Sequence, residues 1–168
     1  MKKIIFLSLF FFINWNSNAQ EKSIDLIGIK TRSNFNQEPF KSWFDTNYQE
    51  YSLDKKVLKK LKKHLKKVEI KVFMGTWCGD SKRETPHLYK LLDSINYNKK
   101  NLTLITVDRS KKTPNNLQEG FDITRVPTFI FYKKGKEIGR YVEYPRETLE
   151  KDILKIVSGK PYKHSYEN

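Results

Sequence analysis

The residues whose types could take part in a reaction lie around the only cysteine of the chain. This stretch reads Val72-Phe73-Met74-Gly75-Thr76-Trp77-Cys78-Gly79-Asp80-Ser81. An apolar strand pattern ends in a turn, and a helix pattern begins at the cysteine. Backbone N–H groups at a helix start stabilise an anion, so this position favours the thiolate, which is the reactive form of cysteine. We therefore predict that Cys78 is a nucleophile.

Charged neighbours act on the thiolate in opposite directions. Lys82 and Arg83 in the first helical turn favour the thiolate, whereas Asp80 opposes it by like-charge repulsion. The sequence does not rank these effects. The alternative is a small, buried and inert cysteine, but the polar residues that follow Cys78 place it in an exposed turn.

The cysteine count and the histidine spacing exclude several kinds of site. One cysteine cannot form an intramolecular disulfide, a CxxC redox pair or a multi-cysteine zinc site. The histidines, His64, His87 and His164, do not have metal-ligand spacing. The sequence also has no glycine-rich phosphate loop. We therefore expect neither a metal nor a cofactor.

Four motifs, in order, resemble those of the thioredoxin family. Trp77-Cys78-Gly79-Asp80-Ser81 is similar to the active-site motif, with Ser81 in place of the second cysteine. Pro86 matches the proline that kinks the active-site helix. Val126-Pro127-Thr128 resembles the cis-proline loop that faces the active-site cysteine. Phe121-Asp122-Ile123 and Phe129-Ile130-Phe131, followed by Lys134-Gly135-Lys136, resemble the flanks of that loop and the next hairpin. The resemblance covers about residues 54–158.

The resemblance assigns roles to individual residues. Cys78 and Ser81 are the candidate catalytic residues. The candidate substrate-binding residues are Trp77, Gly79, Val126, Pro127 and Thr128. A cis Val126–Pro127 bond would leave the Val126 backbone free to pair with an extended peptide beside Cys78, as an added strand does.

Two departures from the family pattern bear on the mechanism. Ser81 cannot resolve a mixed disulfide, although its hydroxyl can hydrogen-bond the Cys78 thiolate. The buried acid that thioredoxins carry on the preceding strand is also missing, because Glu69 sits too early and the matching position is near Val72. These departures put a two-electron dithiol cycle in doubt.

The order of predicted elements defines an α/β fold. We predict helices at 54–67, 81–95 and 146–157 and strands at 68–74, 102–107, 126–132 and 137–144. Residues 111–124 should form a loop with a short helix around Leu117. The central strand–helix–strand unit requires parallel strands, and the hairpin adds antiparallel ones. The expected architecture is a thioredoxin-like fold with a mixed central β-sheet flanked by helices.

The first residues are typical of a secretory signal peptide. Met1-Lys2-Lys3 is followed by the apolar run Ile4–Ile13 and then by Ser17-Asn18-Ala19, which suits cleavage after Ala19. We therefore expect a signal peptide at 1–19, an irregular extension at 20–53 that packs its aromatics on the domain, and a thioredoxin-like domain with a short tail at 54–168. The protein would be an exported bacterial family member, periplasmic or secreted.

The formal net charge of +14 raises the question of an acidic partner. Eight lysines lie between Lys55 and Lys67, on the side of the predicted helix opposite its apolar stripe. Only six of the 33 basic residues are arginines, the type that phosphate and base recognition prefers. We expect no specific nucleic-acid binding. The lysines are interpreted as a solvated helix face, with weak attraction to anionic surfaces as the alternative.

These observations favour thiol–disulfide exchange through one nucleophilic cysteine. The substrates would be protein or low-molecular-weight thiols and disulfides, and an external thiol would resolve the mixed disulfide. The alternative is a non-enzymatic peptide-binding or redox-sensing module on the same fold. A monothiol glutaredoxin that holds an iron–sulfur cluster fits less well, because Asp80 replaces the phenylalanine of its CGFS motif, Trp77 precedes the cysteine, and the chain begins with a predicted export signal.

Overall fold

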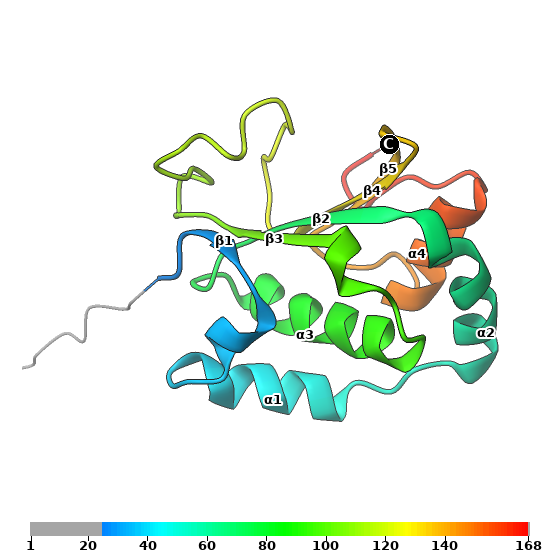
Figure 1. The fold of residues 1–168 in the computed structure, drawn as a ribbon, viewed down its shortest axis with the longest axis horizontal. Coiled ribbons are helices and arrows are strands. Elements are labelled where there is room, and N and C mark those ends of the chain that lie inside the picture. Colours follow the sequence, from blue (N-terminus) through cyan, green and yellow to red (C-terminus); the bar gives the residue numbers. More distant parts are fainter. Residues whose placement is uncertain (1–24, 168) are drawn as a thin grey trace, which may run out of the picture.

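The computed structural model of this protein describes residues 25–167, so the predicted signal peptide lies outside it. Within these residues the chain forms five strands and four α-helices (Figure 1). Their bounds are β1 Gly28–Lys30, α1 Phe40–Glu50, α2 Lys55–His64, β2 Glu69–Met74, α3 Gly79–Ser94, β3 Leu102–Thr106, β4 Thr128–Lys133, β5 Lys136–Val142 and α4 Leu149–Ser158. Short 3-10 helices occupy Arg32–Phe35, Leu65–Lys67 and Lys99–Asn101.

The five strands form one mixed sheet in the order β1-β3-β2-β4-β5. β2 and β3 are parallel and are joined by α3, whereas β4 pairs antiparallel with both β2 and β5. This confirms the predicted mixed sheet. Because β2 and β3 are parallel and α3 connects them, the turn that carries Cys78 lies at the end of the sheet where β2 stops.

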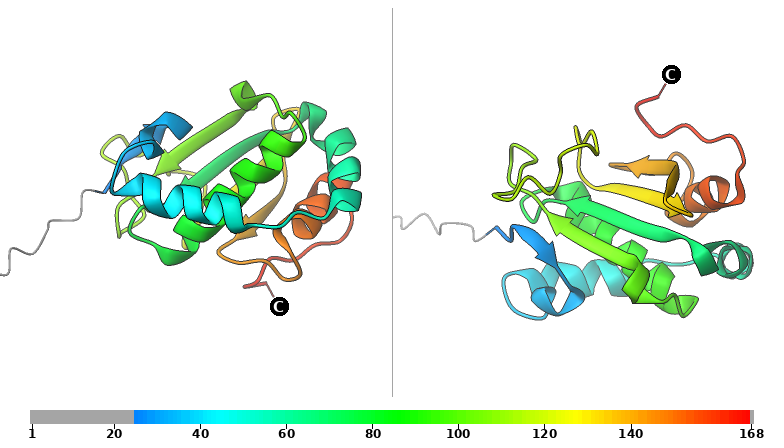
Figure 2. Two further views of the ribbon diagram at one scale, coloured as in Figure 1. Left: turned by 90° about the horizontal axis from the view of Figure 1, so that it is seen from below. Right: turned by 45° about the horizontal axis from the view of Figure 1, so that its top comes forward.

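The two faces of the sheet are covered differently. Side chains alternate along β2, so Ile70, Val72 and Met74 join a core cluster to which all four helices contribute. Seen from below, α1 and α3 lie side by side across this face (Figure 2). Phe73 on the other face belongs to a smaller cluster with Ile105 and Ile130, which the loop between β3 and β4 covers. That loop contains no helix, so the short helix predicted around Leu117 is wrong.

Residues 25–53 are more regular than the sequence analysis expected. β1 pairs antiparallel with β3, and α1 packs its Phe40 and Phe44 into the larger core. The Arg32 guanidinium lies 4.8 Å from the centre of the Phe44 ring and 3.2 Å from the Asp93 carboxylate, which ties this segment to α3. The irregular assignment was therefore wrong for 40–50.

The remaining helices follow their predicted ranges closely. The Asp54 carboxylate accepts hydrogen bonds from the N–H groups of Lys56 and Val57, which caps the start of α2. Gly159 ends α4 with a φ of +73°, a conformation that favours glycine. No helix in residues 25–167 has the length and apolar character that a membrane span requires.

Candidate functional site

The site forms where the end of β2 meets the start of β4. Phe73 on β2 is the register partner of Thr128, the first residue of β4. The chain on either side of this pair therefore brings Cys78 and Val126 together. The Cys78 Sγ lies 3.2 Å from the Val126 carbonyl oxygen, to which it donates a hydrogen bond. The Val126–Pro127 peptide bond is cis.

Cys78 stands at the N-cap of α3, as the sequence analysis placed it. Its N–H donates to the Gly75 carbonyl at 3.0 Å, which closes the turn after β2. Its own carbonyl accepts from Lys82 N, also at 3.0 Å, which begins the helix. The side chain is half-buried. The Cys78 side chain therefore lies at the start of α3 with its Sγ turned toward the Val126 carbonyl.

Ser81 lies one helical turn beyond Cys78 and is fully buried. Its hydroxyl oxygen accepts a hydrogen bond from Gly75 N at 3.2 Å. The sequence predicts that this hydroxyl can hydrogen-bond the Cys78 thiolate. In the structure its oxygen instead fixes the turn in front of the cysteine, so Ser81 acts on Cys78 through the backbone.

The charged residues around Cys78 largely engage one another. Arg83 donates to Asp80 at 2.7 Å and to Glu84 at 2.8 Å. The Asp80 charge is therefore paired, and that of Arg83 is shared between two carboxylates. The expected support of the thiolate by Arg83 and the expected repulsion by Asp80 are both weakened by this pairing.

Trp77 is anchored at the sheet end rather than free to move. Its indole Nε1 donates to the Val107 carbonyl at 2.9 Å. The indole lies directly over Gly75, where a Cβ atom would come within 2.4 Å of the ring. Gly75 is therefore required by the position of Trp77. Trp77 and Cys78 border the smaller core cluster together with Leu117, Phe121 and Ile123, which gives the cysteine an apolar neighbourhood.

The three residues of the cis-proline loop contribute through their backbone. The side chains of Val126, Pro127 and Thr128 are buried. The Thr128 hydroxyl donates to the Arg125 carbonyl at 2.7 Å, which holds the loop in shape. Gly79, by contrast, is exposed at the first position of α3. The geometry thus leaves Gly79 and the peptide groups of the loop, rather than its side chains, to meet a ligand.

The N-terminal segment also reaches this site, which the sequence analysis missed. Leu26 N donates to the Thr76 hydroxyl oxygen at 3.1 Å, and that hydroxyl donates to the Asp25 carboxylate at 3.2 Å. Thr76 is buried and lies two residues before Cys78. We call Asp25, Leu26 and Thr76 the turn clamp. No local pattern could have revealed it, because its partners are about 50 residues apart.

A buried acid occurs on α3 rather than on β2. Val72, where the family acid would be expected, is buried and apolar, whereas Glu84 is only 3% exposed. Burial alone would raise the pKa of the Glu84 carboxyl, but contacts with His87 and Arg83 outweigh it and hold this pKa below its ordinary value. The spacing of Glu84, four residues before buried Leu88, was the signal that could have found it.

His87 packs against Tyr51 and Glu84. It stacks on Tyr51 with ring centres 3.9 Å apart, and its Nδ1 lies 3.6 Å from Glu84. Residues 25–167 contain no group of three or more His, Cys, Asp or Glu side chains that could hold a metal ion. What the site offers is one thiol beside one peptide carbonyl.

Comparison with known proteins identifies the family. The thioredoxin family model matches residues 31–155. Thioredoxin H2 of Arabidopsis thaliana is 30% identical over 84 residues, which cover 50% of this chain and 59% of that protein. Thioredoxin of Mus musculus is 31% identical over 81 residues, which cover 48% of this chain and 71% of that protein. A solved structure of a Pseudomonas aeruginosa protein of unknown function shares the fold, with a TM-score of 0.54 and 16% identity. The match covers 79% of this chain and 84% of that protein.

The chain therefore belongs to the thioredoxin family, as its motifs suggested. The solved structure, at 16% identity, shows the shared fold alone. The matched region spans less than two thirds of the length of Arabidopsis thioredoxin H2.

The turn clamp predicts a specific effect at Cys78. Thr76→Val removes both hydrogen bonds and nearly keeps the side-chain size. We expect it to slow mixed-disulfide formation between Cys78 and a disulfide peptide about fivefold, the equivalent of roughly 1 kcal/mol for one net hydrogen bond. Quenched-flow kinetics measure the rate. Thr76→Ser keeps the hydroxyl and should react like the wild type; an equal loss in both variants would contradict the clamp.

The lowered pKa of Glu84 predicts how stability changes with pH. A carboxyl with a lowered folded-state pKa stabilises the fold above its unfolded-state pKa, and this contribution disappears as the pH falls through the folded value. Glu84→Gln should therefore lower the free energy of unfolding by about 1–2 kcal/mol at pH 7 and by progressively less below pH 4. Urea titrations at several pH values measure the difference. Glu147→Gln, an exposed control, should show little change at pH 7; a pH-independent loss in Glu84→Gln would contradict the assignment.

Proposed function

We propose that this protein is an exported thiol–disulfide exchange protein that works through Cys78 alone. The observation that carries the proposal is the geometry of its single cysteine. The Cys78 thiol lies at a helix start, half-exposed, and 3.2 Å from the carbonyl oxygen of Val126. The chain has no second cysteine to complete a dithiol cycle.

The proposed reaction balances without any group beyond the thiols. The Cys78 thiolate attacks one sulfur of a substrate disulfide, forms a new sulfur–sulfur bond and releases the other substrate sulfur as a thiolate. An external thiolate then attacks the mixed disulfide. If it attacks the Cys78 sulfur, the substrate leaves as a thiolate and a second external thiolate then frees Cys78, leaving the two external thiols joined as a disulfide. If it attacks the substrate sulfur, Cys78 is regenerated and the substrate keeps the external thiol as a mixed disulfide. Each step exchanges one disulfide for another, and the external thiols are the reductant.

Ser81 explains why the second step needs an outside thiol. It occupies the position of the resolving cysteine in the thioredoxin motif, but its hydroxyl oxygen is committed to Gly75 N inside the fold. An alcohol does not displace a thiolate from a disulfide at neutral pH. A free glutathione-like thiol, or a second thiol on the substrate itself, would therefore complete the exchange.

The loop before β4 supports an extended substrate. Val126 presents its backbone beside Cys78, whereas its side chain is buried. A peptide that replaced the thiol as the partner of the Val126 carbonyl would add a short strand next to Pro127 and bring its own disulfide to Cys78. The bound peptide would be bordered by Trp77, Gly79 and Thr128. Of these, Trp77 would offer it an apolar surface.

The trapping assay tests the proposal. Wild type, Cys78→Ala and Ser81→Cys are compared in one disulfide-reduction assay, supplied either with a dithiol reductase system or with glutathione. Wild type should accumulate a mixed disulfide and turn over slowly with the dithiol reductase, and glutathione should restore turnover. Ser81→Cys should turn over several-fold faster with the reductase, because it gains an internal resolving thiol.

One control and two possible results decide between the alternatives. Cys78→Ala should form no mixed disulfide on non-reducing gels. Equal rates for wild type and Ser81→Cys would contradict the external-thiol step. Failure of both to form mixed disulfides, together with retained peptide binding, would favour the non-enzymatic peptide-binding or redox-sensing alternative.

The export part of the proposal rests on the first nineteen residues. A basic start, the apolar run Ile4–Ile13 and small residues at Ser17 and Ala19 support cleavage after Ala19. Mass spectrometry of the protein from its native cells should find Gln20 as the first residue. An intact Met1 in the soluble cytoplasmic fraction would overturn a periplasmic or secreted location.

A further inference from the structure

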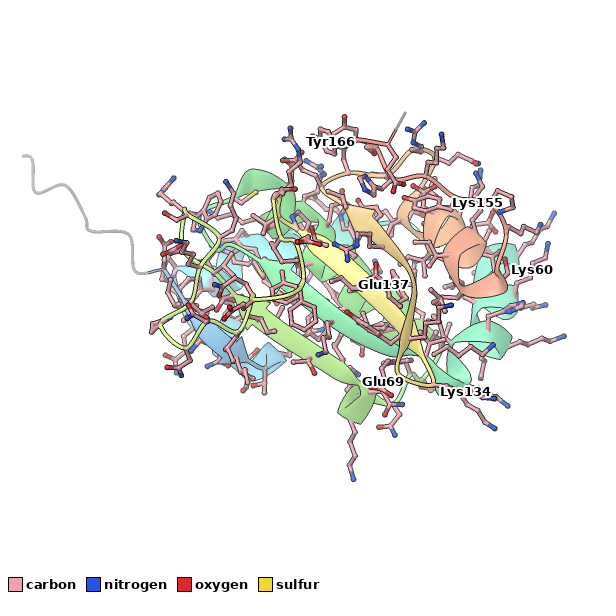
Figure 3. All side chains as sticks on the ribbon, turned by 90° about the horizontal axis from the view of Figure 1, so that it is seen from above. Lys60, Glu69, Lys134, Glu137, Lys155 and Tyr166 are labelled. Atoms are coloured by element: carbon pink, nitrogen blue, oxygen red, sulfur yellow. The ribbon has the colours of Figure 1, made fainter. Side chains whose placement is uncertain are left out.

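The outer side of α2 and of the 3-10 helix that follows it, Leu65–Lys67, carries eight lysines. We call Lys55, Lys56, Lys59, Lys60, Lys62, Lys63, Lys66 and Lys67 the lysine face; all eight are exposed. The opposite side of this helical segment packs into the core, because Leu61 of α2 and Leu65 of the 3-10 helix are fully buried. Figure 3 shows Lys60 pointing outward at the end of the molecule that α2 occupies.

The eight lysines outnumber the two acids that flank them in the sequence, Asp54 and Glu69. In residues 25–167, no Asp or Glu lies within ion-pair distance of any lysine of the lysine face. The Asp54 carboxylate accepts hydrogen bonds from backbone N–H groups at the start of α2 and forms no ion pair with the lysine face. Lysines three or four positions apart, such as Lys59 and Lys63, repel one another and destabilise the helix. An external polyanion would remove this repulsion.

We propose that the lysine face binds a lipid surface with anionic headgroups. The face contains no arginine, the residue suited to bidentate phosphate and base contacts, so it fits a diffuse layer of charge better than a specific nucleic-acid site. Five of its lysines, Lys59, Lys60, Lys62, Lys63 and Lys66, project from neighbouring positions of one helical segment into solvent. Long lysine stems can lie along a lipid surface while their ammonium groups meet phosphates.

The position of the lysine face gives this binding a direction. α2 lies at the end of the molecule where β2 begins, and the Cys78 turn follows the end where β2 stops (Figure 1). A protein held through α2 would therefore present Cys78 away from the lipid surface, toward solvent. This inference does not depend on the proposed exchange reaction, because it concerns a different surface.

Vesicle co-sedimentation tests the proposal. The probes are phosphatidylcholine vesicles and phosphatidylcholine vesicles with one third phosphatidylglycerol. The full chain without its first nineteen residues should bind only the anionic vesicles and should leave them at several hundred millimolar salt. Soluble phosphate at equal ionic strength should not compete. Cys78 should alkylate at the same rate on and off the vesicles.

A matched pair of variants separates the lysine face from net charge. Replacing Lys59, Lys60, Lys62 and Lys63 by glutamine should weaken vesicle binding at least tenfold without lowering the melting temperature, because it removes like-charge repulsion. Replacing Lys30, Lys41, Lys111 and Lys112 by glutamine removes the same four positive charges outside the lysine face. The vesicle affinity of this variant should stay within twofold of the wild-type value. Equal losses in both variants, no vesicle binding by the wild type, or tighter binding to DNA or to polyglutamate at the same salt would each overturn the proposal.

Discussion

The antiparallel register between β2 and β4 is the constraint on which the site depends. Because Phe73 pairs with Thr128, Cys78, five residues after Phe73, lies beside Val126, two residues before Thr128. A slip of one residue would turn Val72 and Met74 away from the helices and bring Phe73 among them. The register is therefore secured by two cores at once, one on each face of the sheet. The 3.2 Å contact between thiol and carbonyl follows from it.

Most polar groups near Cys78 hold the turn rather than take part in chemistry. The Ser81 hydroxyl binds Gly75 N, the Trp77 indole binds the Val107 carbonyl, and Thr76 is held by the N-terminal segment. Once these bonds are made, what remains for a substrate is the thiol, the Val126 backbone and an apolar border. These few groups agree with the proposed exchange reaction, which needs a single thiol. It also means that residues outside the motif, such as Asp25, influence the cysteine through the turn.

The parts of this structure predicted from sequence are those with local signals. The motif around Cys78, the β2–α3–β3 unit and the hairpin all have clear periodicity or turn residues. α1 was missed because Ser42, Asp45 and Asn47 are weak helix formers and Pro39 looked like a break, yet it stands at the N-cap. The helix expected near Leu117 is replaced by a loop because Thr113 and Gln118 bond the backbone there. The turn clamp depends on contacts distant in sequence.

The structure of a mixed disulfide between Cys78 and a short cysteine-containing peptide would test the central claim most directly. The account predicts that the peptide lies extended beside Pro127 and forms backbone hydrogen bonds with Val126, replacing the bond from the Cys78 thiol. Crystallography, or intermolecular NMR contacts with Val126, would detect this pairing. A peptide attached to Cys78 that makes no backbone contact with Val126 would contradict the claim that the β2–β4 register builds a substrate-binding site.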